Sequence, residues 1–454
     1  MKLTRAQVTN FRSVEDSGAF EIGDLTCLVG KNEAGKTAIL QALLGLGPFK
    51  PFKYDRIRDY PRRYLNRYEE RHPSGESEVV KTWWTLDATD LGAVRKAFGE
   101  GVLTGEEFSV VTGIGFEGKT RWALPVNEIK ALEFLAAKFQ LDAAERKVFK
   151  NAEDSKQALS LLEAVPEKSQ RQQELIAHLK SLPESSIHLA AIDILAKRMP
   201  KFFYTSHFER MSGEVALSKL ATDRQQNSVS PSDQIFLDFI EYAGTSLDEL
   251  QQSKRYEELK AQCEGASNEI TDEIFQFWSQ NEALSVKIEL GEGRPQDPDP
   301  FNSGTVAKIR VENQNHRVTV PLSERSAGFV WFFSFLAQFK QLKKNAGNAI
   351  ILLDEPGLTL HGKAQSDLLR YIQERLLPTH QVIYSTHSPF MVPAERLSDV
   401  RVVEDVVEHD DRGRALVKGT KVSADVLSVD RDTLFPLQGH LNMITSQSIQ
   451  RVDE

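Results

Sequence analysis

The feature that most constrains the fold of this 454-residue chain is a glycine-rich segment close to its beginning. Gly30-Lys31-Asn32-Glu33-Ala34-Gly35-Lys36-Thr37 matches the pattern G-x-x-x-x-G-K-S/T in full. An apolar run over 24–29 precedes it and predicts a buried strand, and apolar residues at helical spacing over 37–46 follow it. A strand, a glycine-rich loop and a helix in this order predict a phosphate-binding loop, because backbone N–H groups and the helix N-terminus converge on the phosphates.

The motif assigns a role to several of its own residues. The predicted nucleotide-binding residues are Asn32, Gly35, Lys36 and Thr37, with Lys36 reaching the terminal phosphates and Thr37 offering its hydroxyl to Mg²⁺. The predicted cofactors are therefore ATP and Mg²⁺. A glycine turn that precedes a helix by chance is the structural alternative, and the flanking strand and helix disfavour it.

A second segment supplies acidic side chains at the end of a predicted strand. Four apolar residues, Ile350 to Leu353, lead directly into Asp354 and Glu355. A buried parallel strand that ends in an acid at the carboxyl edge of a sheet places that acid beside the phosphate loop. We expect Asp354 to join Thr37 in holding Mg²⁺, and Glu355 to polarise the attacking water as general base. A strand that merely ends at a charged turn is the alternative.

A third apolar strand, over 382–386, ends at His387. The chain between Asp354 and this strand has room for one crossover helix, so the two strands are predicted to be parallel. His387 is predicted to bond to the terminal phosphate or to the attacking water, which makes it a catalytic candidate beside Glu355. A purely structural histidine is the alternative.

A fourth segment, Ser326-Ala327-Gly328, precedes a long apolar stretch. Together the four segments resemble the ABC-type ATPase heads of chromosome-maintenance and recombination proteins. This resemblance implies that Ser326 and Gly328 of one head cap ATP held by another head, so that ATP joins a dimer. It also implies that Arg12, in the segment Asn10-Phe11-Arg12-Ser13, reaches the nucleotide, and that the turn 357–361 contacts the partner head.

Further segments narrow the resemblance to the OLD (overcoming lysogenization defect) family, which includes the large subunit of the Gabija antiphage system. They are Asp59-Tyr60-Pro61-Arg62-Arg63, Phe202-Phe203-Tyr204, the stretch from Ser323 to Trp331, and Asp432-Thr433-Leu434-Phe435-Pro436-Leu437. The likeness implies an ATPase subunit of an antiphage system, similar to the Septu and PARIS types, that forms homo-oligomers and answers a phage-derived trigger.

The chain departs from that family at its end. OLD proteins normally continue into a Toprim nuclease domain, and the residues after 441 leave no room for one. An ATPase-only protein and a chain that is cut short both agree with this sequence. We therefore expect no intrinsic nuclease activity. We expect instead that the ATPase controls a separate effector protein, a nuclease or another toxic enzyme.

Two other functions stay open: a nucleotide-gated sensor scaffold without turnover, and a DNA repair ATPase of the recombination class. Nucleic acid is a candidate partner because arginines and tyrosines interleave over 50–71. The candidate contacts are Arg58, Arg62, Arg63 and Arg67. The same arginines can equally pair with acids of their own segment and serve only the fold.

The predicted fold class is α/β, an ABC-type P-loop ATPase head with a mixed sheet flanked by helices and with a helical insertion. The predicted parts are the N-terminal part of the head (1–125), the helical insertion (126–199), a return strand (200–215), a helical dimerisation region (216–290) and the C-terminal part of the head (291–454). The region 216–290 lacks sustained heptads, which favours a compact bundle over a coiled-coil arm. The charge-rich segment 404–414 predicts a solvated turn.

Composition excludes several classes of protein. The net charge of −9 argues against a surface coated in positive charge, and no apolar run reaches the length of a membrane helix. The first residues show no secretory signal pattern, and two isolated cysteines, Cys27 and Cys263, exclude a disulfide framework. We therefore expect a cytoplasmic protein without membrane association.

Overall fold

The computed structural model describes residues 1–206, 210–242, 246–251, 256–279, 283–345, 349–409 and 415–425. The chain divides into two compact units, each assembled from separate segments. Unit 1 comprises Met1–Gly23, Gln41–Phe202 and Glu404–Ser423. Unit 2 comprises Asp24–Leu40, Phe203–Val403 and, among the described residues after 423, Ala424 and Asp425.

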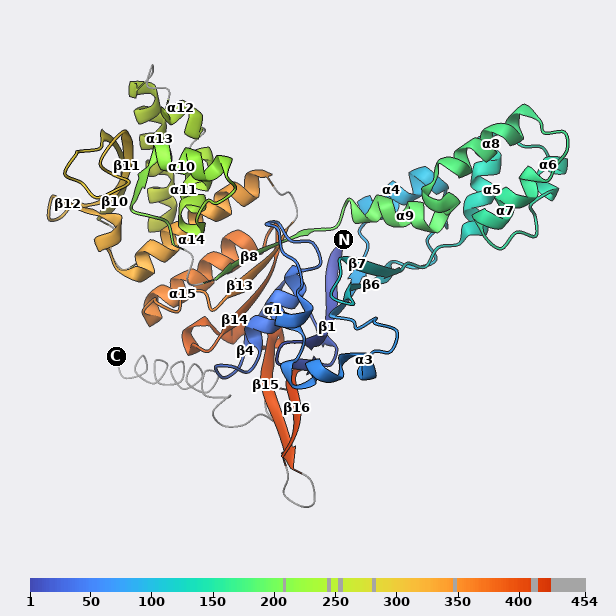
Figure 1. Ribbon diagram of the computed structural model, residues 1–454, viewed down its shortest axis with the longest axis horizontal. Helices are drawn as coiled ribbons and strands as arrows, with labels where there is room; N and C mark the ends of the chain where they lie inside the picture. The colour runs from blue at the N-terminus through green and yellow to red at the C-terminus, as the bar shows by residue number, and fades with distance from the viewer. Residues whose placement is uncertain are drawn as a thin grey trace, which may run out of the picture. The chain divides into compact units, whose positions relative to one another are not determined.

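The centre of unit 2 is a sheet in which strands distant in sequence lie side by side (Figure 1). The strand order is β15-β4-β14-β13-β8, and the pairs β15–β4, β4–β14 and β14–β13 are parallel. Their bounds are Leu25–Val29 (β4), Lys201–Ser206 (β8), Ala349–Asp354 (β13), Gln381–Thr386 (β14) and Val400–His409 (β15). The carboxyl ends of β4, β13 and β14 therefore meet at one edge of the sheet.

These strands form because their sequences are almost wholly apolar. Every residue of β4 and of β13 is buried, as expected of parallel strands covered on both faces. Helix α1 (Lys36–Leu44) follows β4, and helix α15 (Gly362–Tyr371) makes the crossover from β13 to β14. The three predicted strands, over 24–29, 350–353 and 382–386, thus occur at the predicted places.

A second sheet and a group of helices complete unit 2. The antiparallel sheet has the order β10-β11-β12, and β9 also pairs with β11. The strands are Glu214–Ala216 (β9), Leu284–Glu292 (β10), Thr305–Asn313 (β11) and Val318–Pro321 (β12), and the helices are Leu217–Gln225 (α10), Pro231–Tyr242 (α11), Leu247–Gln251 (α12), Tyr256–Phe277 (α13) and Ala327–Asn345 (α14). Phe332 and Phe333 of α14 and Phe239 of α11 belong to one buried apolar cluster with β4 and β13.

Unit 1 is built on an antiparallel sheet with the order β2-β1-β5-β6-β7, in which β3 also pairs with β1. The strands are Lys2–Phe11 (β1), Val14–Asp16 (β2), Phe20–Glu21 (β3), Val80–Thr85 (β5), Glu107–Ile114 (β6) and Lys119–Ala123 (β7). Strand β16 (Ala415–Ser423) lies beside β2, where the N–H of Thr420 donates to Ser13 O at 3.2 Å.

Three helices of unit 1 begin at capping boxes. Asp87, Asp142 and Ser169 each form a capping box at the start of α4, α6 and α8, which satisfies backbone N–H groups that a helix leaves free. Helices α5 to α8 lie close together (Figure 1). The bounds are Arg56–Asp59 (α2), Tyr68–Arg71 (α3), Ala88–Phe98 (α4), Glu128–Lys138 (α5), Ala143–Lys147 (α6), Ser155–Glu163 (α7), Gln170–Ser181 (α8) and Ile187–Ala196 (α9).

The segment predicted as a solvated turn is partly a strand. Strand β15 continues through residues 404–409, so that part of the prediction is wrong. The acidic residues of this segment are flanked by valines, in the sequence Val402-Val403-Glu404-Asp405-Val406-Val407. Because valine favours extended backbone, the segment forms a strand despite its charges. Residues 410–414 and the family-like segment 432–437 lie outside the described residues. Within the described parts, no helix has the length and apolar character that crossing a bilayer requires.

Candidate nucleotide site

The predicted phosphate loop connects β4 to α1 and has the backbone shape that its glycines allow. Gly35 adopts φ +104°, a conformation that favours glycine, and Glu33 adopts φ +68°. Gly30 has no room for a side chain, because a Cβ there would lie 2.1 Å from the carbonyl oxygen of Val403. The loop therefore ends at the N-terminus of a nine-residue helix, where N–H groups and the helix dipole attract anions.

Lys36, the first residue of α1, is buried but reaches three oxygens. Its Nζ donates to the carbonyl oxygens of Gly30 and Lys31 at 2.9 Å each and lies 3.1 Å from Glu355 Oε1. The side chain of Lys36 is only 5% exposed, so its charge lies in a region where water screens it weakly. A cation held over a loop of this shape suits the terminal phosphates of a nucleotide.

Asp354, the last residue of β13, is surrounded by hydroxyl groups from three other elements. Thr37 Oγ1 lies 3.0 Å from Asp354 Oδ1 and 2.9 Å from Oδ2. Tyr204 OH donates to Oδ2 at 2.9 Å, and Ser385 Oγ donates to Oδ1 at 2.7 Å. The loop and the acid are more than three hundred positions apart in sequence, and the fold brings them into direct contact.

Glu355 follows Asp354 and turns its carboxylate toward the loop. Its backbone has φ +49°, which is uncommon for a residue with a side chain, and its N–H donates to Ser385 Oγ at 2.9 Å. One carboxylate oxygen faces Lys36, and the other lies 2.8 Å from His387 Nδ1. The structure thus brings together Lys36, Thr37, Asp354, Glu355 and His387, all of which the sequence singles out.

The residues present fit Mg²⁺ and a nucleotide phosphate. Thr37 and Asp354 offer a hydroxyl and a carboxylate, which are the hard oxygen ligands that Mg²⁺ prefers, and few protein ligands suit an ion that keeps water and substrate phosphates. Lys36 and the N-terminus of α1 supply the positive charge that phosphates require. Asn32 is an exposed residue of the same loop.

Ser388, the residue after His387, is held by a chain of hydrogen bonds that includes Gln365 of α15. Gln365 Nε2 donates to Gly357 O at 3.0 Å, and Ser388 Oγ donates to Gln365 Oε1 at 2.5 Å. The residue next to His387 is therefore tied to the turn that follows Glu355. His387 itself is 38% exposed, so solvent reaches the imidazole.

Ser326 and Gly328 occupy the start of α14 and differ in their surroundings. Ser326 is exposed, and its Oγ accepts from the N–H of Phe329 at 3.4 Å. Gly328 is buried, and a Cβ there would lie 2.6 Å from Leu360 Cδ2 and 3.0 Å from Thr359 O. Close packing against Leu360 and Thr359 therefore requires glycine at position 328, whereas the exposed side chain of Ser326 is accessible to a partner.

The remaining site candidates belong to unit 1. Arg12 Nε and Nη2 each donate to Asp59 Oδ1 at 3.1 Å, and Arg58 donates to both oxygens of the same carboxylate. Arg63 lies over the ring of Tyr64, 5.5 Å from its centroid. Among the described residues, Arg62 and Arg67 have no ion-pair partner, so they are the freest of the four candidate nucleic-acid contacts.

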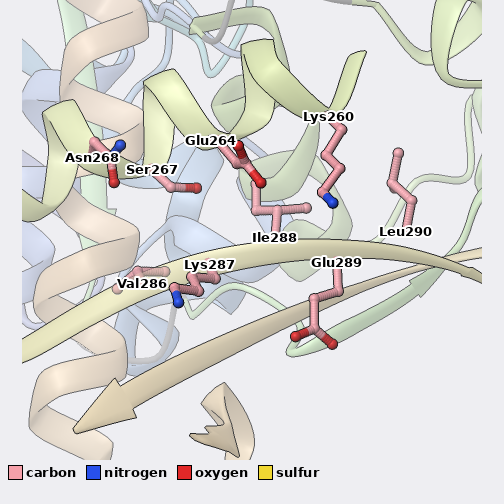
Figure 2. A pocket seen from close by; sticks show the side chains of 9 residues that line it. All are labelled: Lys260, Glu264, Ser267, Asn268, Val286, Lys287, Ile288, Glu289 and Leu290. Carbon is pink, nitrogen blue, oxygen red and sulfur yellow. The ribbon is translucent and has the colours of Figure 1, made fainter. Parts of the chain in front are cut away.

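Sequence reasoning assigned no role to Ser385, Tyr204 and Gln365, although the structure places all three at or near the site. The parallel register of β13 and β14 could have indicated Ser385. Leu353 pairs with Tyr384, so the next residues of the two strands, Asp354 and Ser385, are also neighbours. A groove of about 620 Å³ between α13 and β10 contains none of the predicted residues (Figure 2). Its lining includes Lys260 and Glu264 of the helix.

Comparison with known proteins identifies relatives over parts of the chain. The OLD nuclease of Thermus scotoductus is 30% identical over 161 residues, which are 35% of this chain and 28% of that protein. The uncharacterized protein MJECL44 of Methanocaldococcus jannaschii is 36% identical over 86 residues, 19% of this chain and 24% of that protein. The matched segments thus span about a quarter of these curated relatives. The match to the OLD nuclease confirms the predicted resemblance to the OLD family over the 161 residues that it covers.

Solved structures give a more distant likeness. An Smc head bound to the C-winged helix domain of ScpA aligns with a TM-score of 0.40 at 13% identity, covering 93% of this chain and 98% of that chain. The SMC head domain from Thermotoga maritima aligns with a TM-score of 0.37 at 12% identity, with the same two coverages.

A family model described as an AAA ATPase domain matches residues 1–83 and 118–392, which is well over half of the chain. The match includes the phosphate loop, the acidic pair 354–355 and His387. It supports ATPase activity, and with the sheets of unit 2 it confirms the predicted α/β class of a P-loop ATPase head. The chain belongs to the AAA ATPase domain family.

Proposed function

We propose that the chain is the Mg²⁺-dependent ATPase subunit of an OLD-like antiphage system that acts in ATP-joined assemblies and controls a separate effector. The observation that carries the hydrolytic part is the carboxylate of Glu355, which lies between Lys36 Nζ at 3.1 Å and His387 Nδ1 at 2.8 Å. A carboxylate beside both the phosphate-binding lysine and an imidazole is placed to take a proton from water.

Each residue then has one task at the phosphates. Lys36 and the N-terminus of α1 bind the terminal phosphates, and Thr37 and Asp354 are the residues that would hold Mg²⁺. When bound, Mg²⁺ supplies positive charge that stabilises the transferring phosphoryl group. Glu355 accepts the proton of the attacking water. His387 orients that carboxylate through Nδ1 and bonds to the terminal phosphate or to the attacking water.

The exposed Ser326 at the N-terminus of α14 supports the assembly part of the proposal. In a dimer, Ser326 and the backbone of Gly328 of one subunit would cap ATP held by the other, so nucleotide binding and association are linked. The effector is a nuclease or toxin carried on another protein, and a phage-derived molecule is the trigger. Two free, buried cysteines, Cys27 and Cys263, agree with a cytoplasmic setting.

The direct test compares Glu355→Gln with Lys36→Ala in purified protein. Glu355→Gln keeps the shape of the side chain but removes the base, so turnover should fall by about 10²–10⁴-fold while ATP binding persists. Lys36→Ala should weaken ATP binding itself, measured with a fluorescent ATP analogue. Unchanged turnover in Glu355→Gln would show that the base is assigned wrongly.

A second candidate function, a nucleotide-gated scaffold, is favoured by the ion pair between Lys36 and Glu355. That contact occupies the base and keeps turnover low until the lysine moves to a phosphate. In this case Glu355→Gln would leave effector binding intact, whereas Lys36→Ala would abolish it. A DNA repair role would instead require the exposed Arg62 and Arg67 to bind nucleic acid.

A further inference from the structure

The carboxylate of Asp354 is held from three sides, and only one of its partners belongs to the phosphate loop. A carboxylate has about four lone-pair sites. Thr37 has a single proton to donate, Ser385 Oγ donates to Oδ1 at 2.7 Å, and Tyr204 OH donates to Oδ2 at 2.9 Å. Three of the four lone-pair sites of the Asp354 carboxylate then accept a hydrogen bond. The three hydroxyl groups thereby fix the direction of the fourth site, which stays available for a metal ion.

Burial makes these hydroxyl bonds consequential. Asp354 is 7% exposed and Ser385 is fully buried, so a lost donor cannot be replaced freely by water. Without the hydroxyl of Tyr204 or Ser385, the carboxylate of Asp354 would have one contact fewer to fix its orientation. Partners of this kind orient the ligands of a metal and tune its affinity.

Ser385 makes a second contact within the site. Its Oγ accepts the backbone N–H of Glu355 at 2.9 Å, at the residue whose φ is +49°. One side chain therefore fixes both the carboxylate that would hold Mg²⁺ and the backbone from which the general base projects. A left-handed backbone at a residue with a side chain persists only when its neighbours hold it.

We propose that Tyr204 and Ser385 are positioning residues: both orient Asp354 for Mg²⁺, and Ser385 additionally fixes Glu355 for proton transfer. This inference rests on the proposed ATPase function and assigns different kinetic effects to the two hydroxyls. Loss of the Tyr204 hydroxyl affects the metal requirement. Loss of the Ser385 hydroxyl affects the metal requirement and also the chemical step.

The test for Tyr204 is Tyr204→Phe, with Tyr384→Phe as matched control. The hydroxyl of Tyr384 is buried in the same unit but donates to the carbonyl oxygen of Met391 at 2.6 Å, outside the site. Binding of a fluorescent ATP analogue is titrated with Mg²⁺ and repeated in EDTA. Tyr204→Phe should raise the Mg²⁺ concentration for half-maximal tight binding by about 10–100-fold and leave binding in EDTA unchanged. Tyr384→Phe should change neither value.

The test for Ser385 is Ser385→Ala, with Ser334→Ala as matched control. Ser334 is equally buried, donates to Val330 O and accepts from the N–H of Met211, so it has the same bonding pattern away from the site. At saturating Mg²⁺, Tyr204→Phe should recover the wild-type kcat, whereas Ser385→Ala should remain slower by about tenfold or more. Ser334→Ala should keep the wild-type Mg²⁺ dependence and kcat.

The outcomes separate this inference from the proposed function. If Tyr204→Phe binds nucleotide with wild-type Mg²⁺ dependence, or if Tyr384→Phe shifts it equally, the positioning role is wrong even though the ATPase assignment stands. If the wild type binds nucleotide with Mg²⁺ but has no turnover, hydrolysis is wrong, and the Mg²⁺ titrations still decide the role of Tyr204. A wild type without Mg²⁺-dependent nucleotide binding overturns both.

Discussion

At the scale of single residues, the arginine that the family resemblance assigns to the nucleotide is already bound by a carboxylate. Arg12, at φ +52°, and Arg58 both donate to Asp59, whose side chain is fully buried. Burial by itself would raise the pKa of the Asp59 carboxyl, but hydrogen bonds from Arg58, from the Asp55 backbone and from Arg12 outweigh it and hold that pKa below its ordinary value. The ionised form of Asp59 therefore stabilises unit 1.

The same residue gives a prediction about pH. Because the pKa of Asp59 is lowered in the folded state, its contribution to stability is present above the unfolded pKa of about 3.9 and is lost as pH falls through the folded value. Asp59→Asn should lower the free energy of unfolding at pH 7 by about 1–3 kcal/mol, and the deficit should shrink in acid. Urea unfolding of wild type and Asp59→Asn at pH 7 and near pH 3 measures this difference in the free energy of unfolding. Glu117→Gln, in an exposed pair with Lys119, is the control and should be indistinguishable from wild type; a constant deficit for Asp59→Asn would contradict the explanation.

At the scale of elements, the start of α14 separates a packing role from a binding role. Gly328→Ala places a methyl group against Leu360 Cδ2 at 2.6 Å and Thr359 O at 3.0 Å, so overpacking should lower the free energy of unfolding by about 1–3 kcal/mol. The loss should appear without nucleotide, by urea unfolding. Ser326→Ala, at the exposed neighbour, should lower the free energy of unfolding by about 0.5–1 kcal/mol, since only a weak helix cap is lost. Wild-type stability for Gly328→Ala would show that the helix start moves freely.

The elements also show what the sequence could and could not predict. Strands β4, β13 and β14 were predictable, because buried parallel strands are short apolar runs and each of these ends at a chemically distinctive residue. Tyr204 was not, because β8 joins the edge of the same sheet from a remote part of the chain and its tyrosine looks like any other strand aromatic. The prediction of a turn at the end of β15 was wrong, because it followed from the charged residues, which favour a turn, and not from the valines, which favour a strand.

At the scale of the whole molecule, chain order and spatial order differ. The loop at Gly30–Thr37 and the acid at Asp354 form one site in unit 2, although residues of unit 1 separate them in sequence. The two motifs could predict that they meet, since each needs the other for chemistry. They could not predict where unit 1 begins and ends, because helix caps occur in both units, for example at Asp87 in unit 1 and at Ser246 in unit 2.

The net charge of −9 also constrains how copies of the molecule associate. Like charges oppose association at low ionic strength, so an assembly needs a specific bridge rather than general attraction. In the proposed function that bridge is ATP, held by Lys36 and Thr37 of one subunit and capped by Ser326 of another. Glu355→Gln should preserve the bridge because it slows hydrolysis.

ATP should therefore raise the mass of the protein in solution. In sedimentation velocity, Glu355→Gln with ATP and Mg²⁺ should form a dimer or larger species, which should dissociate when ADP replaces ATP or when EDTA is added. Adding Ser326→Arg, a bulky cation at the exposed cap, should prevent the ATP-dependent increase while binding of a fluorescent ATP analogue is retained, because each subunit's own loop is unchanged. Ser303→Arg, in an exposed loop of the same unit, matches the change in size and charge and should leave assembly intact. An assembly of the same mass with and without ATP would mean that another surface joins the subunits, and Ser326 would then have no role in association.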